Sequence, residues 1–110
     1  MKEEFCIMKD NPPYWRNKRE RGLHRHEVFF GTANRKKSIQ DGLVVFLTPE
    51  RHNLSSNGVH FNRAFDLELK QAGQRAYMKH YKKSVEEFIE RYGRNYLWVI
   101  MKNYLKNTTN

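Results

Sequence analysis

Histidines gather between His24 and His60, a stretch that holds four of the five in the chain. Imidazole nitrogen is a common ligand of divalent metal ions, and a bound ion needs two or three such nitrogens within about 2.0–2.2 Å. A histidine taken singly is more often a surface or packing residue, so the spacing has to bring several together. His26, His52 and His60 meet this requirement if they lie at adjoining ends of neighbouring elements.

Two short strands are the first elements that would position these histidines. Residues 26–30 are apolar enough for a strand that Gly31 ends, and residues 43–47 form a β-branched and aromatic run that Pro49 ends. Residues 32–41 between them are polar and cationic, which predicts a loop. We expect an antiparallel pair, with His26 at one edge of the first strand and His52 just past the second.

A helix is the third positioning element. Residues 54–58 contain Asn-Gly and predict a turn. From His60 onward the apolar spacing becomes helical, and one face would carry Phe61, Phe65, Leu69, Ala72 and Ala76. Gly73 weakens this helix by about 1 kcal/mol relative to alanine without breaking the pattern. A helix N-terminus beside His60 would offer N–H groups and a positive dipole end to a phosphate.

The C-terminal part of the chain predicts further helices. Residues 84–87 read Ser-Val-Glu-Glu, a capping-box sequence, and Gly93 is placed to end the helix that it opens. Residues 96–105 fit either a third helix or a strand. His80 is expected on the surface of the long helix, and Trp15 is expected to be buried.

Charge and cysteine content limit the class of protein. With 21 Lys and Arg against 12 Asp and Glu, the net charge is +9, which favours a polyanionic partner such as nucleic acid. The alternative is a basic protein that its charge keeps soluble. Cys6 is the sole cysteine, so an intrachain disulfide and a cysteine-rich zinc site are excluded. Without a signal-peptide or membrane-span pattern, we expect one domain, residues 1–110, in the cytoplasm.

The segments HRHEVFFG, GLVVFLTPERHN and SSNGVH resemble the small phage HNH nucleases with a ββα-metal site, close to the RecA-dependent nuclease (recombination enhancement function) group. The similarity covers about residues 23–97 and is most specific at HEVFFG, LTPERHN and GVHFN. It implies an α+β fold, namely a small ββα-metal (HNH) finger with a long helix and one or two C-terminal helices. The domain would comprise a basic N-terminal segment (1–22), the ββα site (24–65) and a helical part (66–106).

The resemblance also implies roles for individual residues. His26, His52 and His60 match the metal ligands, although His60 follows His52 at a longer interval than is usual. Glu27 stands where the family commonly has a second histidine as general base, and His24 could assist it. An alternative register makes His26 the base and leaves the metal to the other two. The Asn that gives HNH its middle letter has two candidates, Asn34 and Asn53.

The function implied is a metal-dependent DNA endonuclease that hydrolyses phosphodiesters, in phage recombination or DNA processing within the bacterial host cytoplasm. It would use one divalent ion, Mg²⁺ or Mn²⁺ by expectation and Zn²⁺ or Ni²⁺ as alternatives. DNA would be the substrate, with RecA filaments as a partner by resemblance and no membrane. Four cations are expected to contact phosphates or, alternatively, to form a solvated face: Arg35, Lys36, Lys37 and Arg63. The alternative function is a non-catalytic DNA- or RNA-binding module that retains the ββα frame.

Overall fold

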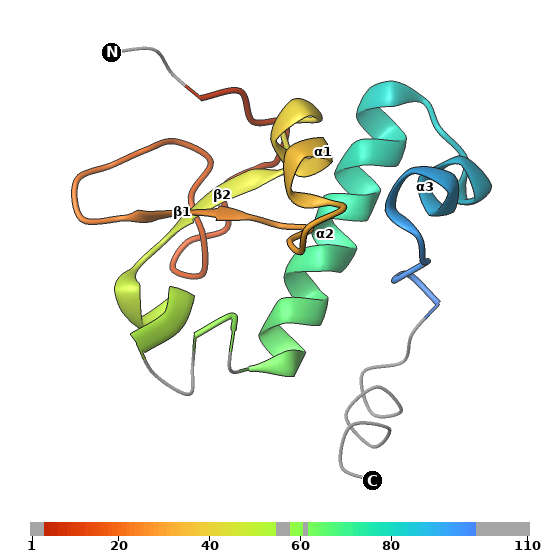
Figure 1. Ribbon diagram of the computed structural model, residues 1–110. Helices are drawn as coiled ribbons and strands as arrows, with labels where there is room; N and C mark the ends of the chain where they lie inside the picture. The colour runs from red at the N-terminus through yellow and green to blue at the C-terminus, as the bar shows by residue number, and fades with distance from the viewer. Residues whose placement is uncertain (1–3, 55–57, 61, 99–110) are drawn as a thin grey trace, which may run out of the picture.

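A computed structural model describes residues 4–54, 58–60 and 62–98 of the chain (Figure 1). It shows an α+β fold in which a two-stranded antiparallel sheet lies beside the longest helix. The elements in chain order are β1 (His24–Glu27), α1 (Arg35–Gln40), β2 (Val44–Leu47), the π-helix η1 (Glu50–Leu54), α2 (Arg63–Tyr81) and α3 (Val85–Tyr92). The α+β class predicted from the sequence is therefore confirmed.

The two strands pair antiparallel, as predicted, with His26 opposite Val45 and His24 opposite Leu47. All four residues of β2 are buried, which explains its unbroken apolar sequence. β1 begins two residues earlier than predicted and ends at Glu27, although Val28 N still donates a hydrogen bond to Leu43 O at 3.0 Å. Burial of the four apolar side chains of β2 stabilises this part of the fold.

The loop predicted over residues 32–41 is wrong, because α1 forms within it. Contacts outside this short helix stabilise it. Ser38 is fully buried and its Oγ donates to Leu43 O at 2.6 Å, while Lys37 Nζ donates to Arg91 O at 2.8 Å. Propensity alone does not predict a six-residue helix, since its stability comes from tertiary contacts.

The long helix α2 begins at Arg63, three residues later than predicted, so His60 precedes it. Asn62 is the N-cap, and its side chain accepts a hydrogen bond from Phe65 N at 3.0 Å. The predicted apolar face is confirmed where it is described: Phe65 and Leu69 are buried, and Ala72 and Ala76 pack partly buried against the core. Phe61 lies outside the described residues.

Gly73 allows α2 to approach the chain that leaves β1. A Cβ at this position would lie 2.9 Å from Val28 Cγ1 and 3.1 Å from Phe29 Cε2. The glycine that weakens helical propensity is therefore required by the close packing of helix against strand.

The capping box predicted at α3 is confirmed. Ser84 Oγ accepts from Glu87 N at 3.1 Å, the Glu87 carboxylate accepts from Ser84 N at 3.0 Å, and Gly93 ends the helix with φ 94°. α3 packs on α2 and on the exit of β1 through aromatic contacts, such as Phe88 with Phe29 at a ring-centroid distance of 5.3 Å. Of the third element predicted over 96–105, residues 99–105 lie outside the described part.

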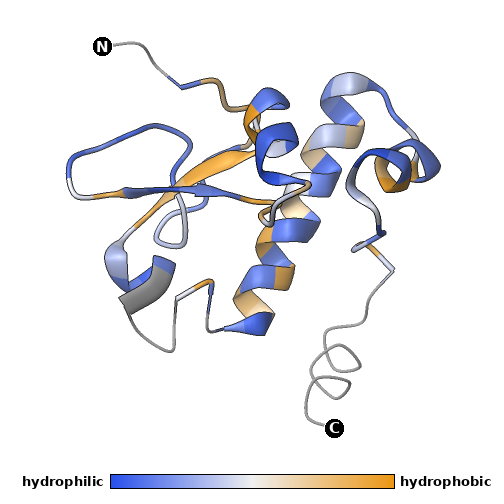
Figure 2. Cartoon of the chain, viewed as in Figure 1, coloured by the Kyte–Doolittle hydropathy of each residue, from blue (hydrophilic) through white to orange (hydrophobic). Residues whose placement is uncertain are grey.

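The N-terminal segment, residues 4–23, has no helix or regular strand in its described structure but is tied to the fold. Trp15 is buried, as predicted, and Arg16 pairs with Phe46 in an isolated β-bridge. β2 is hydrophobic, α2 alternates between hydrophobic and hydrophilic positions, and the loop before β1 is largely hydrophilic (Figure 2). None of the described helices has the length and apolar character that crossing a membrane requires.

Candidate metal centre

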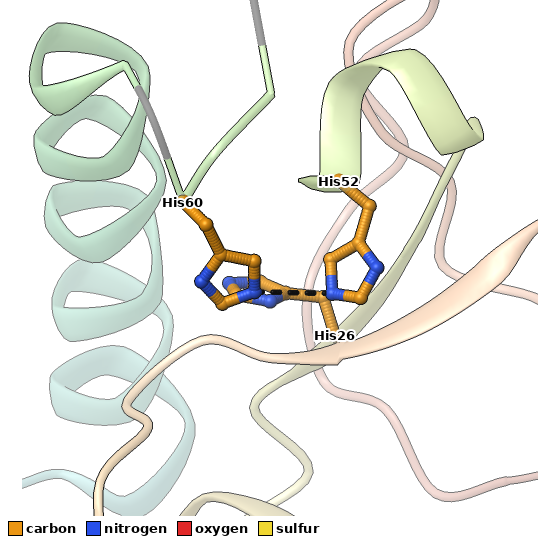
Figure 3. Close-up of side chains that lie close together, drawn as sticks. All are labelled: His26, His52 and His60. Atoms are coloured by element: carbon orange, nitrogen blue, oxygen red, sulfur yellow. Dashed lines mark hydrogen bonds between the residues drawn. The ribbon is translucent and has the colours of Figure 1, made fainter. Parts of the chain in front are cut away.

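The structure brings His26, His52 and His60 together at one end of the hairpin (Figure 3). One ring nitrogen from each lies within 4.8 Å of the others, and Nε2 of His52 is 3.2 Å from Nε2 of His60. The three histidines come from β1, from η1 and from the residues just before α2. Segments up to 34 positions apart in sequence thus converge on one point.

Backbone geometry fixes His52 beside His60. Val59 N donates to Arg51 O at 2.5 Å and His60 N donates to His52 O at 3.3 Å, so the two segments run side by side. Gly58 permits this approach, because a Cβ there would lie 3.0 Å from both Glu50 O and His52 O. The π-helical turn η1 belongs to a rare class that occurs frequently at functional sites.

His26 is the buried member of the cluster, with 2% of its surface exposed. Burial, followed by the charges of His60, His52 and Lys70, lowers the pKa of His26 to about 3. Its imidazole is therefore neutral near pH 7 and has a free lone pair, the form that binds a metal ion. Its Nε2 is buried without a hydrogen-bond partner. Such an atom is costly unless a ligand satisfies it.

His52 is half-buried and also favours the neutral form. Burial, His60 and His24 all lower the pKa of the His52 imidazole. Its Nδ1 lies 3.2 Å from Nδ1 of His24, on the side of the ring opposite His60. His24, the predicted supporting residue, can therefore accept a hydrogen bond from a protonated Nδ1 of His52. This hydrogen bond would orient the His52 ring so that its Nε2 can bind a ligand.

The three nitrogens fit a divalent ion in their spacing. Ligands about 2.05 Å from a tetrahedral centre lie about 3.3 Å apart, close to the 3.2 Å between Nε2 of His52 and Nε2 of His60. One ring nitrogen of His26 lies within 4.8 Å of the nitrogens of the other two histidines and would supply a third ligand. The donor set therefore suits a metal ion, with further coordination positions open to water or substrate.

Glu27, the predicted base, has a different environment from its neighbour His26. Its carboxylate forms ion pairs with Arg35 Nε at 3.0 Å and with Arg25 Nε at 3.7 Å. Successive side chains of a strand point to opposite faces, so Glu27 shares a face with Arg25 and His26 shares one with His24. The role of Glu27 as a base stays a prediction.

The two candidate asparagines lie differently. Asn34 is the N-cap of α1, and its Nδ2 donates to Tyr92 O at 3.1 Å, a contact that joins α1 to α3. The side chain of Asn53 lies outside the described part of the structure.

Two residues beside the centre were missed in the sequence. Asp66 is buried, and its Oδ1 has no hydrogen-bond partner while Oδ2 pairs with Lys70 Nζ at 2.8 Å. Burial raises the pKa of the Asp66 carboxyl, opposed by Lys70 and by the charge of His60. The i,i+4 spacing of Asp66 and Lys70 was readable as a helical ion pair. The sequence did not show that this pair lies next to the histidines, because that depends on how α2 packs.

The four predicted phosphate-binding cations lie on α1 and at the start of α2. Arg35 is largely exposed while it pairs with Glu27, and Lys36 and Arg63 are exposed. Lys37 is partly buried, with its ammonium group on Arg91 O. Three of the four are thus accessible to a ligand, and the fourth joins α1 to α3.

His80 is exposed on α2, as predicted, and lies outside the cluster.

Comparison of the chain with protein-family models, with curated proteins and with solved structures finds no match. The interpretation of the centre therefore rests on its geometry and chemistry.

Proposed function

We propose that this protein is a metal-dependent endonuclease that hydrolyses DNA phosphodiesters at the three-histidine centre. The observation that carries the proposal is the buried, neutral His26, which has an unpartnered Nε2 and whose ring centroid lies 5.4 Å from that of His52 and 5.2 Å from that of His60. A packing histidine would have its ring nitrogens satisfied, whereas a ligand must keep one lone pair available.

The order of elements supports a ββα-metal arrangement of the HNH type. β1 supplies one ligand, the turn after β2 the second, and the residues before α2 the third. The net charge of +9 supports a polyanionic substrate, which exposed cations such as Lys36 and Arg63 would hold without sequence preference.

The donor set favours Zn²⁺ or Ni²⁺ over the Mg²⁺ or Mn²⁺ expected from the sequence. Imidazole suits the borderline transition metals, while Mg²⁺ prefers carboxylate, carbonyl and water oxygens. Among the described residues, the carboxylates near the centre are engaged in ion pairs, Asp66 with Lys70 and Glu27 with Arg35. A three-imidazole site would therefore bind Mg²⁺ weakly.

In this proposal the residues around the centre would bind the metal ion, orient its ligands and remove a proton from water. A bound divalent ion supplies charge neutralisation at the scissile phosphate and acidifies water. His26, His52 and His60 hold that charge in place, and His24 orients His52. Glu27 is paired with two guanidinium groups and lies on the other face of β1 from His26, so its action as a base would require release of these ion pairs and reorientation of the carboxylate.

A nicking assay tests the proposal. Supercoiled plasmid and single-stranded circles are incubated with metal-free protein and with added Zn²⁺, Ni²⁺, Mn²⁺ or Mg²⁺. We expect nicking that requires a metal and falls by at least about 100-fold in His52→Ala. His80→Ala is the matched control, because His80 is exposed and outside the cluster, and it should retain full activity. Metal-independent nicking, or equal activity in the two variants, would refute the proposal.

A second function has one observation in its favour. The ion pairs of Glu27 withhold the only carboxylate on β1 from the histidine face, as expected of a non-catalytic DNA- or RNA-binding module with a structural metal. Folded protein that binds metal and shows salt-sensitive DNA binding, but cleaves neither naked DNA nor RecA-coated strands, would establish this alternative.

A further inference from the structure

A groove of about 650 Å³ lies between the N-terminal segment and the C-terminal half of α2. Its floor is apolar and is formed by Ile7, Met8, Trp15, Ala72 and Ala76. The volume lies within the range of about 300–1,000 Å³ that is usual for ligand pockets. In the described structure the groove shares no residue with the metal centre.

The rim of this groove is positively charged. Lys9, Arg75 and Lys79 border it, with His80 beside them, against the single carboxylate of Asp10. Arg75 and Lys79 are exposed and lie one helical turn apart on α2, so both can reach the same ligand. An anionic ligand with an apolar part would therefore complement both the rim and the floor.

The walls are fixed by hydrogen bonds before any ligand arrives. Trp15 Nε1 donates to Lys9 O at 3.0 Å, and Asn17 Nδ2 donates to Met8 O at 3.0 Å. The carboxylate of Asp10 accepts from Asn17 N at 2.6 Å, which ties it to its own segment. A wall that is already ordered loses little conformational entropy on binding.

We propose that this groove binds a short acidic, amphipathic peptide segment of a protein partner. The floor combines aliphatic side chains with Met8 and the largely buried Trp15, which suits the apolar side chains of a docked peptide. The rim cations would pair with aspartates or glutamates on either side of those apolar anchors. The proposal is independent of the chemistry at the metal centre.

Other occupants fit less well. A single-stranded nucleic acid needs aromatic faces on which its bases stack, but Trp15 is only 6% exposed and packs near Phe65. Residues 99–110 of this chain contain two lysines and no acidic residue, so their charge does not complement the rim. A second copy, with a net charge of +9, would be repelled in the same way.

The test uses the full chain and a synthetic peptide of repeated Glu-Leu-Leu-Glu units. We expect this peptide to shift the methyl NMR signals of Ile7, Met8, Ala72 and Ala76, and versions with Gln for Glu or Ser for Leu to bind more weakly. Arg75→Glu with Lys79→Glu should raise the dissociation constant, measured by fluorescence anisotropy, by about tenfold or more. Both side chains are exposed, and a preserved amide spectrum would verify the fold.

Lys18→Glu with Arg21→Glu is the matched control. It changes the net charge equally at two exposed positions outside the groove and should alter the dissociation constant by about twofold or less. Equal weakening in the two double variants would overturn the proposal, because it would indicate attraction by net charge alone. So would unshifted methyl signals at about 1 mM peptide, or displacement of the peptide from the groove by oligothymidylate.

Discussion

Two polar clusters of this molecule differ in how far their hydrogen bonds are satisfied. In the first, Asp41 accepts from Arg91 Nη2 at 2.9 Å and from Tyr92 Oη at 2.6 Å, and its backbone carbonyl accepts from Tyr81 Oη at 2.9 Å. Burial and then the bond to Asp41 raise the pKa of Tyr92, so its hydroxyl stays protonated as a donor. This network, the Asp41 cluster, joins the turn before β2 to α2 and α3.

The metal centre is the opposite case. His26 Nε2 and, beside the centre, Asp66 Oδ1 are buried without partners. Leaving a buried polar group unsatisfied costs about 1–3 kcal/mol, so the surrounding structure must hold it in place. This difference separates a closed network, which joins helices, from an open cluster, which under the proposed function would receive a metal ion.

Acid should destabilise the metal-free protein through the open cluster, and this is the largest effect we expect. The pKa of His26 is about 3 in the folded protein, against an ordinary value of 6.5. Between these two pH values the His26 imidazole is protonated in the unfolded chain but neutral in the folded protein. The free energy of unfolding should therefore fall as pH decreases from about 6.5 towards 3, by up to about 5 kcal/mol. Urea denaturation between pH 7 and 4 measures it.

Carboxylates also titrate in this range, so a variant isolates the histidine. His26→Phe removes the titrating group and keeps an aromatic ring beside Phe30. Its stability should depend less on pH than that of the parent chain. Identical pH profiles for the two proteins would show that His26 does not carry the effect.

The closed cluster should respond to Asp41→Ala with a loss of about 2–4 kcal/mol in the free energy of unfolding. The substitution leaves Tyr92 Oη buried without its acceptor and Arg91 without its carboxylate. Glu90→Ala on the exposed face of α3 is the control and should stay within about 0.5 kcal/mol. Metal affinity, measured by calorimetry, should be unchanged in both variants, and a weakened affinity in Asp41→Ala would mean that the clusters are coupled.

A saturating metal should stabilise only a chain with an intact centre. At a free Zn²⁺ or Ni²⁺ concentration about 100 times the dissociation constant, unfolding should require about 2.7 kcal/mol more. Asp41→Ala should keep this increment, while His52→Ala should lose it. Thermal denaturation with metal and with chelator measures both, and stabilisation of His52→Ala equal to that of the parent would place the ion elsewhere.

His24→Ala should have the smallest effect, a metal affinity about 10–100-fold lower. The variant removes the partner of His52 Nδ1 but none of the three converging nitrogens. His24→Gln, which can still accept a hydrogen bond, should recover part of the affinity. A loss as complete as in His52→Ala would make His24 a ligand instead of a positioning residue.

Local sequence signals predicted the elements that local forces determine. Ser84 and Glu87 form their capping box within four residues of each other, and an unbroken apolar run predicts β2. α1 was missed because contacts outside the helix stabilise it, including a hydrogen bond from Lys37 to the distant Arg91 O and the burial of Ser38. The start of α2 was misplaced, although Asn62 is a favoured N-cap residue and was a readable signal.

At the site, the sequence predicted that His26, His52 and His60 converge, although His26 lies inside β1 and not at its edge. The sequence did not predict the environment of Glu27. His26 and Glu27 are adjacent in sequence but face opposite sides of a strand that begins two residues earlier than expected. The position of Asp66 beside the centre depends on the packing of α2, which no short sequence pattern encodes.

The missing side chain of Gly73 has a consequence for how this protein would respond to selection. An alanine in the middle of an exposed helix is ordinarily favoured by about 1 kcal/mol, so a screen for thermal stability alone would be expected to sample it. Here a methyl group would press on Val28 and Phe29, which directly follow the strand that carries His26. Selection for metal binding should preserve Gly73. Without a Cβ at this position, α2 can pack closely against the residues that follow β1, the strand that carries His26.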